Sequence, residues 1–261
     1  MSSSGRASIA KTVSECFIDL ESPDPLVRDV GAASRLGDMI DAGALDVGQL
    51  QDVGDRLILL LEHERVEVRS FAALVLSRVL RKAVYRDNWF ELFRTWYSNE
   101  EQQTGYDLSL GWVHAVAHGA DALAAFGHFG LVAPEAILEV ACARMLHAGD
   151  SVWRDQEDDR LGYAIAVTLR DPRFTNAMAS SWLAPIREAF QRGEPGPVPA
   201  FASNTMRTLR MVSVLGDVDL AYAGNQLGTT RAPASRSILK TLALVSPGMW
   251  TSLPRMHLPS Q

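Results

Sequence analysis

The sequence predicts an all-α protein. Two observations lead to this prediction. Strict alternation of apolar and polar residues is scarce, whereas apolar residues recur at helical spacing from Ser8 to about Leu215. A short motif with a polar residue near its start also returns at intervals of 41 to 47 residues, which indicates a repeated helical unit.

Residues that disfavour helix divide the chain into roughly ten helices of ordinary length. In chain order they are Pro23 and Pro25, Gly43, His63 to Arg65, Tyr85 to Asn88, Thr104 to Asp107, Phe129 to Pro134, Ala148 to Asp155, Asp171 to Pro172, and the GEPGPVP stretch at 193–199. Clear amphipathicity is lost after Gly216. We therefore expect a helical domain over residues 1–216 and an irregular or partly helical C-terminal extension, frayed at its end, over residues 217–261.

The repeat becomes visible when five segments are aligned. They are VRDVGAASRL from Val27, VRSFAALVLS from Val68, VHAVAHGADA from Val113, DRLGYAIAVT from Asp159 and MRTLRMVSVL from Met206. Their aligned polar residues, here called the ladder residues, are Arg28, Arg69, His114, Arg160 and Arg207, spaced 41, 45, 46 and 47 residues apart. This period predicts a HEAT-like helical repeat, an α-solenoid whose ladder helices pack side by side and parallel. A compact helical bundle is the alternative.

Composition limits the function classes. A chain of 261 residues with 47% hydrophobic content can bury a substantial core. A net charge of -6 and a pI near 5.5 argue against nucleic acid as a partner, because a broad phosphate-neutralising surface needs positive charge. Cys16 and Cys142 are too few for a disulfide framework or a thiolate zinc cluster. No stretch reaches the roughly 20 apolar residues that cross a bilayer, so we expect a cytoplasmic protein without a membrane partner.

The most informative segment is GWVHAVAHGAD at 111–121. On a helix, His114, His118 and Asp121 would lie within an arc of about 60°. The other side chains from Leu110 to Phe126 are apolar, Ala or Gly, so this polar stripe would lie on a helix that is otherwise buried. Because buried polar groups need partners, the stripe points to a site.

Three chemistries could use this stripe. Two imidazoles and a carboxylate can bind zinc or iron, but the glutamate of an HExxH motif and a second HxxxH are absent, so we expect no metal and no cofactor. One imidazole could act as general acid or base, with Asp121 fixing its tautomer. The stripe could also bind a ligand through hydrogen bonds alone. For His118, a structural role as a core histidine bonded to a carbonyl is equally compatible with the sequence.

Partners for the stripe are expected from the neighbouring repeats. Four acids at 155–159 exceed what a helix cap requires, and Asn204 with Arg207 forms an i, i+3 pair. Ladder arginines are usually structural, which is the favoured role for Arg28 and Arg69. The candidate catalytic residues are His114, His118 and Asp121. The candidate ligand-binding residues are Trp112, Arg69, Glu157, Asp158, Arg160, Asn204 and Arg207.

The runs VEVRSFAALVLSRVL, GWVHAVAHGADAL, EDDRLGYAIAVTL and NTMRTLRMVSVL, in this order and spacing, resemble the bacterial domain of unknown function 2785 family over about residues 20–216. The resemblance implies an all-helical, HEAT-like cytoplasmic chain without an established general activity. It also carries over a set of polar residues. They are His114, His118, Asp121, Arg69, Glu157, Asp158, Arg160, Asn204 and Arg207.

Two function classes remain. The first is a helical-repeat protein whose polar, histidine-containing pocket binds a small-molecule ligand or substrate, with histidine acid/base chemistry on a metabolite as its enzymatic form. The second is a non-enzymatic scaffold for a protein or peptide, in which the stripe is structural. We favour the pocket because the polar residues converge on one repeat. The sequence leaves open whether the protein is an enzyme, which substrate it takes, and whether it forms a homo-oligomer.

Overall fold

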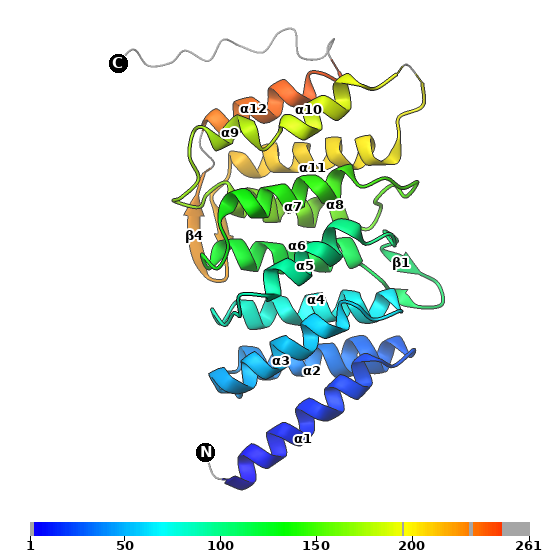
Figure 1. Cartoon of the computed structure of the whole chain (residues 1–261), viewed down its shortest axis with the longest axis vertical. Helices are drawn as coiled ribbons and strands as arrows, with labels where there is room; N and C mark the ends of the chain where they lie inside the picture. The colour runs from blue at the N-terminus through cyan, green and yellow to red at the C-terminus, as the bar shows by residue number, and fades with distance from the viewer. Residues whose placement is uncertain (1–2, 195, 230–231, 247–261) are drawn as a thin grey trace.

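The computed structural model describes residues 3–194, 196–229 and 232–246, and these residues are predominantly helical, as predicted (Figure 1). The helices before the central hairpin are α1 (Ser3–Leu20), the π-helix η1 (Leu26–Ala33), α2 (Ser34–Asp41), α3 (Val47–Leu60), α4 (Val66–Leu80) and α5 (Trp89–Asn99). Those after it are α6 (Ala115–His128), α7 (Pro134–Leu146), α8 (Glu157–Thr168), α9 (Met178–Ser181), α10 (Ala184–Gln191), α11 (Ala200–Gly216) and α12 (Ala232–Leu242).

The fold also contains two antiparallel hairpins, which the all-α prediction did not include. The first, here called the central hairpin, joins β1 (Tyr106–Asp107) to β2 (Gly111–Trp112). The second joins β3 (Leu220–Tyr222) to β4 (Asn225–Gly228) and is called the β3–β4 hairpin. Strands of two to four residues are too short to produce a detectable period-2 pattern. They nevertheless matter for the site, because each hairpin lies beside a ladder helix.

The helices succeed one another along the long axis of the molecule, from α1 at one end to α12 at the other (Figure 1). α4 packs against α6, α6 against α8, and α8 against α11. The Asp121 and Arg160 side chains join α6 to α8, and the Asp158 and Arg207 side chains join α8 to α11. His114 at the start of α6 contacts Asp155 just before α8, and Gly127 and Thr168 at the ends of these helices are neighbours, so α6 and α8 run parallel. Trp153 before α8 likewise contacts Asn204 in the first turns of α11, and Gly162 faces Met211 further along, so α8 and α11 run parallel. No helix among the described residues has both the length and the apolar character needed to cross a membrane.

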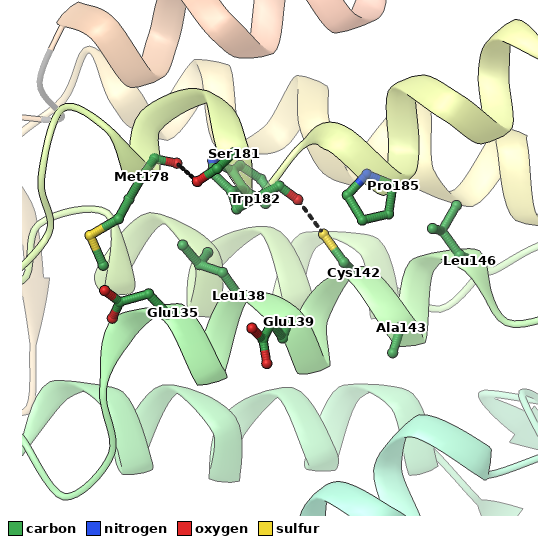
Figure 2. A pocket seen from close by; sticks show the side chains of 10 residues that line it. All are labelled: Glu135, Leu138, Glu139, Cys142, Ala143, Leu146, Met178, Ser181, Trp182 and Pro185. Atoms are coloured by element: carbon green, nitrogen blue, oxygen red, sulfur yellow. Dashed lines mark hydrogen bonds between the residues drawn. The ribbon is translucent and has the colours of Figure 1, made fainter.

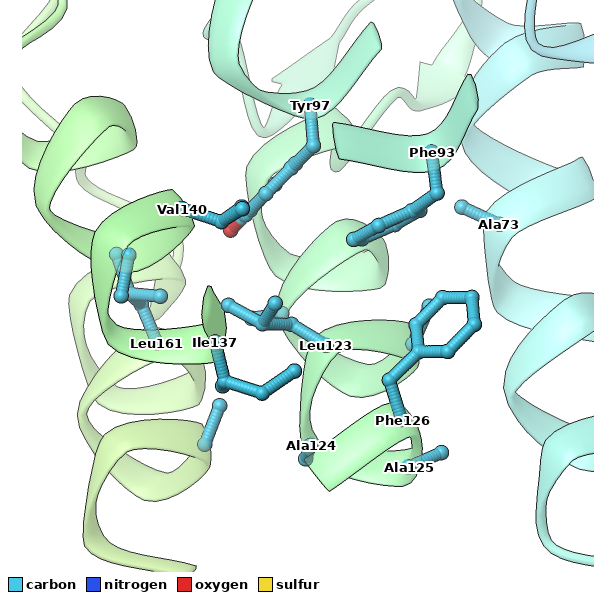
Figure 3. Packing of buried hydrophobic residues seen from close by; sticks show 14 of the residues in the cluster. Ala73, Phe93, Tyr97, Leu123, Ala124, Ala125, Phe126, Ile137, Val140 and Leu161 are labelled. Carbon is cyan, nitrogen blue, oxygen red and sulfur yellow. The ribbon is translucent and has the colours of Figure 1, made fainter. Parts of the chain in front are cut away.

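A single hydrophobic cluster runs through these helices. Phe93 and Tyr97 of α5 stack with ring centroids 5.5 Å apart, and Phe126 of α6 lies 5.1 Å from Phe93 (Figure 3). Gly119 permits this approach, because a Cβ atom there would lie 2.2 Å from the Tyr97 ring. The core therefore fixes the distance between α5 and the start of α6.

The start of α6 corrects one expectation. The helix begins at Ala115, so His114 is its N-cap residue, with φ 47° and ψ 31° in the left-handed region, and does not share a helical stripe with His118 and Asp121. The amides of Val113 and His114 both donate to the Gly105 carbonyl, at 2.8 and 3.1 Å, which holds the chain in this turn. Gln156 begins α8 in the same way, with φ 69°.

After Gly216, the described residues 217–229 and 232–246 contact the preceding helices. Arg170, two residues after the end of α8, donates to the carbonyls of Leu215, Val218 and Gly228 at 2.6, 3.1 and 2.6 Å. α12 lies against α11 and α9, and the β3–β4 hairpin precedes it. The end expected to be frayed lies outside the described residues.

Candidate functional site

His118 is buried between α4 and α6. Its Nδ1 lies 2.9 Å from the Ser70 hydroxyl, and its ring meets Phe71 edge-on at 4.9 Å. Burial lowers the pKa of His118 well below its usual value, and the neighbouring charges of His114 and Arg160 lower this pKa further. His118 is therefore a neutral, hydrogen-bonded core side chain. The structural role considered for it from the sequence involved a carbonyl partner, whereas the partner in the structure is the Ser70 hydroxyl.

His114 links the central hairpin to the loop before α8. Its Nε2 lies 3.0 Å from the Asp155 carbonyl oxygen, and its ring stacks on Trp112 at 4.4 Å. A carbonyl oxygen only accepts hydrogen bonds, so Nε2 carries the proton. Burial lowers the pKa of His114, an effect that the bond to Asp155 opposes. This histidine thus holds a backbone segment in place.

Glu157 comes close to His114 only through the backbone of Asp155. Its Oε2 accepts a hydrogen bond of 2.8 Å from the Asp155 amide, whereas Oε1 is buried without a partner among the described residues. A Cβ atom on Gly105 would lie 2.2 Å from Oε1, so only glycine fits there. Burial raises the pKa of Glu157. His114 and Glu157, which the sequence predicted to share a pocket, are thus connected through the Asp155 backbone, and no pocket described in the structure contains both side chains.

The remaining predicted partners hold loops. Arg207 pairs with Asp158 at 2.7 Å and donates to the Trp153 carbonyl. Asn204 accepts from the Trp153 amide and donates to the Ser151 carbonyl, both at 2.9 Å.

Two ladder arginines act in the same way. Arg28, fully buried, donates to the Leu110 carbonyl at 2.8 Å and so anchors the central hairpin. Arg69 holds Glu100 through two bonds of 2.7 and 2.9 Å and also donates to the carbonyls of His63 and Glu64. Their favoured structural role therefore agrees with their contacts, and Arg69 lies in a different hollow from the cavity described next.

Two predicted site residues, Asp121 and Arg160, face a cavity of about 550 Å³, here called the hairpin cavity. Its lining residues are Arg81, Asp121, Asp159, Arg160, Tyr163, Met211, Leu215, Tyr222 and Ala223. They come from α6, α8, α11, the C-terminal end of α4 and the β3–β4 hairpin. His114 and His118 are not among them, so the expected combination of both histidines with Asp121 in one pocket is wrong. The left-handed turn at His114 and the burial of His118 explain the difference.

The hairpin cavity contains two kinds of arginine. Arg160 forms a two-point ion pair with Asp121 across α6 and α8. Arg81 instead lies 5.8 Å from the centroid of the Tyr222 ring, and its Nε is buried without a hydrogen-bond partner in the described part of the chain. The Tyr222 hydroxyl proton likewise has no acceptor among the described residues. Burial raises the pKa of Tyr222 to about 12, whereas the charge of Arg81 and hydrogen bonding from its side chain to the hydroxyl lower this pKa.

A second hollow, of about 420 Å³, lies between α7 and the α9–α10 segment (Figure 2). It is lined mainly by apolar side chains, among them Leu138 and Met178, and Glu135 and Glu139 also line it. The Cys142 thiol donates to the Trp182 carbonyl at 3.0 Å, and burial raises the pKa of Cys142 to about 12. The thiol is therefore protonated and unreactive. None of the predicted site residues lines this hollow.

Metal-ligating side chains do not converge: in residues 3–194, 196–229 and 232–246, no group of three or more His, Cys, Asp or Glu residues is arranged to hold an ion.

Arg81 and Tyr222 were not predicted as site residues. The Gly224–Asn225 dipeptide is a turn signal that could have identified the hairpin, where Gly224 has φ 83°. No local signal distinguishes Arg81 from the other basic residues near it.

Comparison with known proteins gives one match. The family model described as protein of unknown function (DUF2785) matches residues 58–214. This match begins later than the resemblance expected from about residue 20, and it ends before Tyr222. No curated protein and no solved structure matches the chain.

Proposed function

The chain belongs to the DUF2785 family, whose description assigns no activity, and we propose from its geometry that it binds a small molecule in the hairpin cavity. The observation that carries this proposal is the convergence of Asp121, Arg160, Arg81 and Tyr222 on one cavity beside apolar side chains. Small-molecule sites combine these features: a concave shape, a mainly apolar wall and a few convergent polar groups.

In this proposal the stacked helices form a HEAT-like α-solenoid. Its support is the repeat of the ladder residues together with the side-by-side packing of α4, α6, α8 and α11. The hairpin cavity then lies on the row of ladder helices. We place this function in the cytoplasm, because both cysteines are free and buried.

Within this proposal the two histidines support the site without touching the ligand. His118 fixes α6 against α4, and His114 fixes the loop before α8. Because α6 carries Asp121 and α8 carries Arg160, both histidines position the ion pair that lines the cavity. Their expected role in catalysis is replaced by a positioning role.

A test uses variants that fill the cavity. We would screen a metabolite extract and a fragment library by native mass spectrometry and thermal shift against the wild-type protein, Met211→Trp and Asp159→Trp. Asp159 is exposed, so its variant blocks the rim without disturbing the core. Val214→Trp, on α11 at a position that is 63% exposed and outside the cavity, is the matched control. Compounds should bind the wild type and the control, but not the filled variants. Absence of any bound compound, or unchanged binding in both filled variants, would refute the proposal.

An interaction scaffold is the second candidate, favoured by the exposed apolar residues of the central hairpin. Leu108 is 97% exposed, and Tyr106 and Trp112 beside it are about half exposed. Such a patch is typical of a protein contact. Selection from a peptide library would test it: peptides whose binding is lost in Leu108→Ser and Trp112→Ser, but kept in Met211→Trp, would support the scaffold.

A further inference from the structure

Two hydrogen-bond donors in the hairpin cavity lack an acceptor. Tyr222 is only 6% exposed; the Arg81 side chain acts as a donor toward its hydroxyl oxygen, but within the described residues neither the hydroxyl proton nor Nε of Arg81 has an acceptor. An arginine side chain can only donate, and buried donors without acceptors are rare in folded proteins. The two groups lie side by side, with the guanidinium carbon 5.8 Å from the centroid of the tyrosine ring. One acceptor placed between them could serve both.

Arg81 also has no ion-pair partner among the described residues, although the exposed carboxylate of Asp159 lines another part of the same cavity. The other arginines near the cavity are engaged: Arg160 pairs with Asp121, and Arg170 donates to four backbone carbonyls. Arg81 forms no ion pair with any residue in the part of the chain that the structure describes. A half-buried guanidinium beside a buried hydroxyl is a favourable environment for an anion.

From these contacts we infer that the ligand carries a carboxylate or phosphate group, which Arg81 and Tyr222 hold between α4 and the β3–β4 hairpin. The inference rests on the proposed function, because it concerns the same cavity. Both anions accept two or more hydrogen bonds, which suits the two donors.

The rest of the cavity indicates the body of the ligand. Met211 and Leu215 of α11 supply apolar surface, and Tyr163 supplies an aromatic ring. A volume of about 550 Å³ is sufficient for a small organic acid. The expected ligand class is therefore a small aromatic or aliphatic acid, with its acidic group at the Arg81 end.

Binding would also fix the hairpin. Tyr222 lies on β3 next to the turn, where Ala223 and Gly224 have φ 47° and 83°. An anion that contacts Arg81 and Tyr222 together would connect this hairpin to α4. Amide hydrogen exchange in residues 220–228 should therefore slow when an anion binds.

The test compares ligands that differ only in charge. Benzoate, phenyl phosphate, inorganic phosphate and uncharged benzamide would be titrated into the full-length protein by calorimetry at pH 7 and constant ionic strength. Benzoate or phenyl phosphate should bind at least about tenfold more tightly than benzamide, since a charge-assisted hydrogen bond is worth about a factor of ten or more. The tighter of the two identifies the preferred anion, and binding of inorganic phosphate as tight as that of phenyl phosphate would show that the phosphate alone is recognised.

Variants test the assignment of residues. Arg81→Gln should weaken anion binding about tenfold or more, and Tyr222→Phe, which removes only the hydroxyl, should weaken it several-fold. Lys82→Gln is the matched control, because it removes one positive charge from the adjacent, exposed position. Equal loss in the control would show that only the general electrostatic field acts, and would overturn the inference.

The two proposals fail differently. If benzamide binds as tightly as benzoate and Asp159→Trp abolishes both, the cavity binds small molecules but the anion inference is wrong. If neither anion binds while other compounds bind in the cavity, the inference is likewise wrong. If no compound of any class binds, the proposed function fails and the inference fails with it.

Discussion

The hydroxyl of Ser70 on α4 lies 2.9 Å from Nδ1 of His118 on α6. Ser70 is 0% exposed and His118 is 6% exposed. This bond connects the second turns of two neighbouring ladder helices. It gives the central histidine of the GWVHAVAHGAD segment a partner inside the protein.

Removing either partner should destabilise the protein. Ser70→Ala leaves the imidazole nitrogen without its partner, and we expect a loss of about 1–3 kcal/mol in the free energy of unfolding. His118→Ala should cost at least as much, because the ring packing against Phe71 is lost as well. Urea denaturation measures both. Ser14→Ala removes an exposed hydroxyl and should change stability by less than about 0.5 kcal/mol. A neutral Ser70→Ala variant would contradict a structural role for His118.

Stability should fall as the pH falls below about 6.5. The pKa values of His114 and His118 are lowered in the folded protein from an ordinary value of 6.5, mainly by burial. Below pH 6.5 the unfolded chain therefore binds protons that the folded chain does not, so stability is present at higher pH and is lost on acidification. Each such histidine contributes up to about 1.4 kcal/mol per pH unit. Urea midpoints between pH 5 and 7.5 measure the slope, and His118→Asn should reduce it; an unchanged slope in this variant would argue against the shift.

Gly119→Ala should destabilise the protein strongly. The added methyl group would lie 2.2 Å from ring atoms of Tyr97, whose position is fixed by stacking on Phe93. Forcing an extra carbon into a packed core costs about 1–3 kcal/mol or more. The matched control is Gly37→Ala in α2, where the nearest atom lies at 3.8 Å and helix propensity should give a gain of about 0.5–1 kcal/mol. Thermal melts of both variants would show shifts of opposite sign.

Arg170→Met should release the β3–β4 hairpin. The substitution keeps much of the apolar stem but removes the donors to the Leu215, Val218 and Gly228 carbonyls. Hydrogen exchange in residues 217–228 should accelerate, and any ligand of the hairpin cavity should bind more weakly, because Tyr222 loses its support. Arg187→Met removes a guanidinium that donates to the Ser180 carbonyl and serves as the control. Equal exchange in both variants would mean that Arg170 does not hold the hairpin.

Helical periodicity correctly predicted the mostly helical fold and the packing of the ladder helices, because burial repeats with the helical turn. The buried position predicted for His118 agrees with the structure, whereas the pairing of Asp121 with Arg160 was not predicted. Periodicity failed at His114, since the left-handed turn there depends on two bonds to the carbonyl of Gly105. Such bonds depend on the folded hairpin, which leaves no periodic trace.

The hairpin cavity could be predicted only in part, because some of its residues lie outside the repeat. Asp121 and Arg160 lie in segments that the repeat aligns, so both could be identified as candidate site residues, but the sequence did not predict their ion pair. Arg81 and Tyr222 are 141 positions apart in the sequence and meet only because the hairpin folds back over the end of α4. A contact between an element outside the repeat and one helix end has no counterpart in the other repeats, and self-alignment cannot detect it.

The irregular segment 151–155 is held from both sides. His114 binds the carbonyl of Asp155, while Asn204 and Arg207 of α11 bind Trp153. Loops of this kind usually tolerate insertions, because their backbone contacts water. Here an inserted residue would separate contacts that span α6 and α11, so length variation among natural homologues should be rare at 151–155 and concentrated in the 193–199 connection instead. The same restriction makes the 193–199 connection the better place to insert a reporter or to create the new termini of a circular permutant.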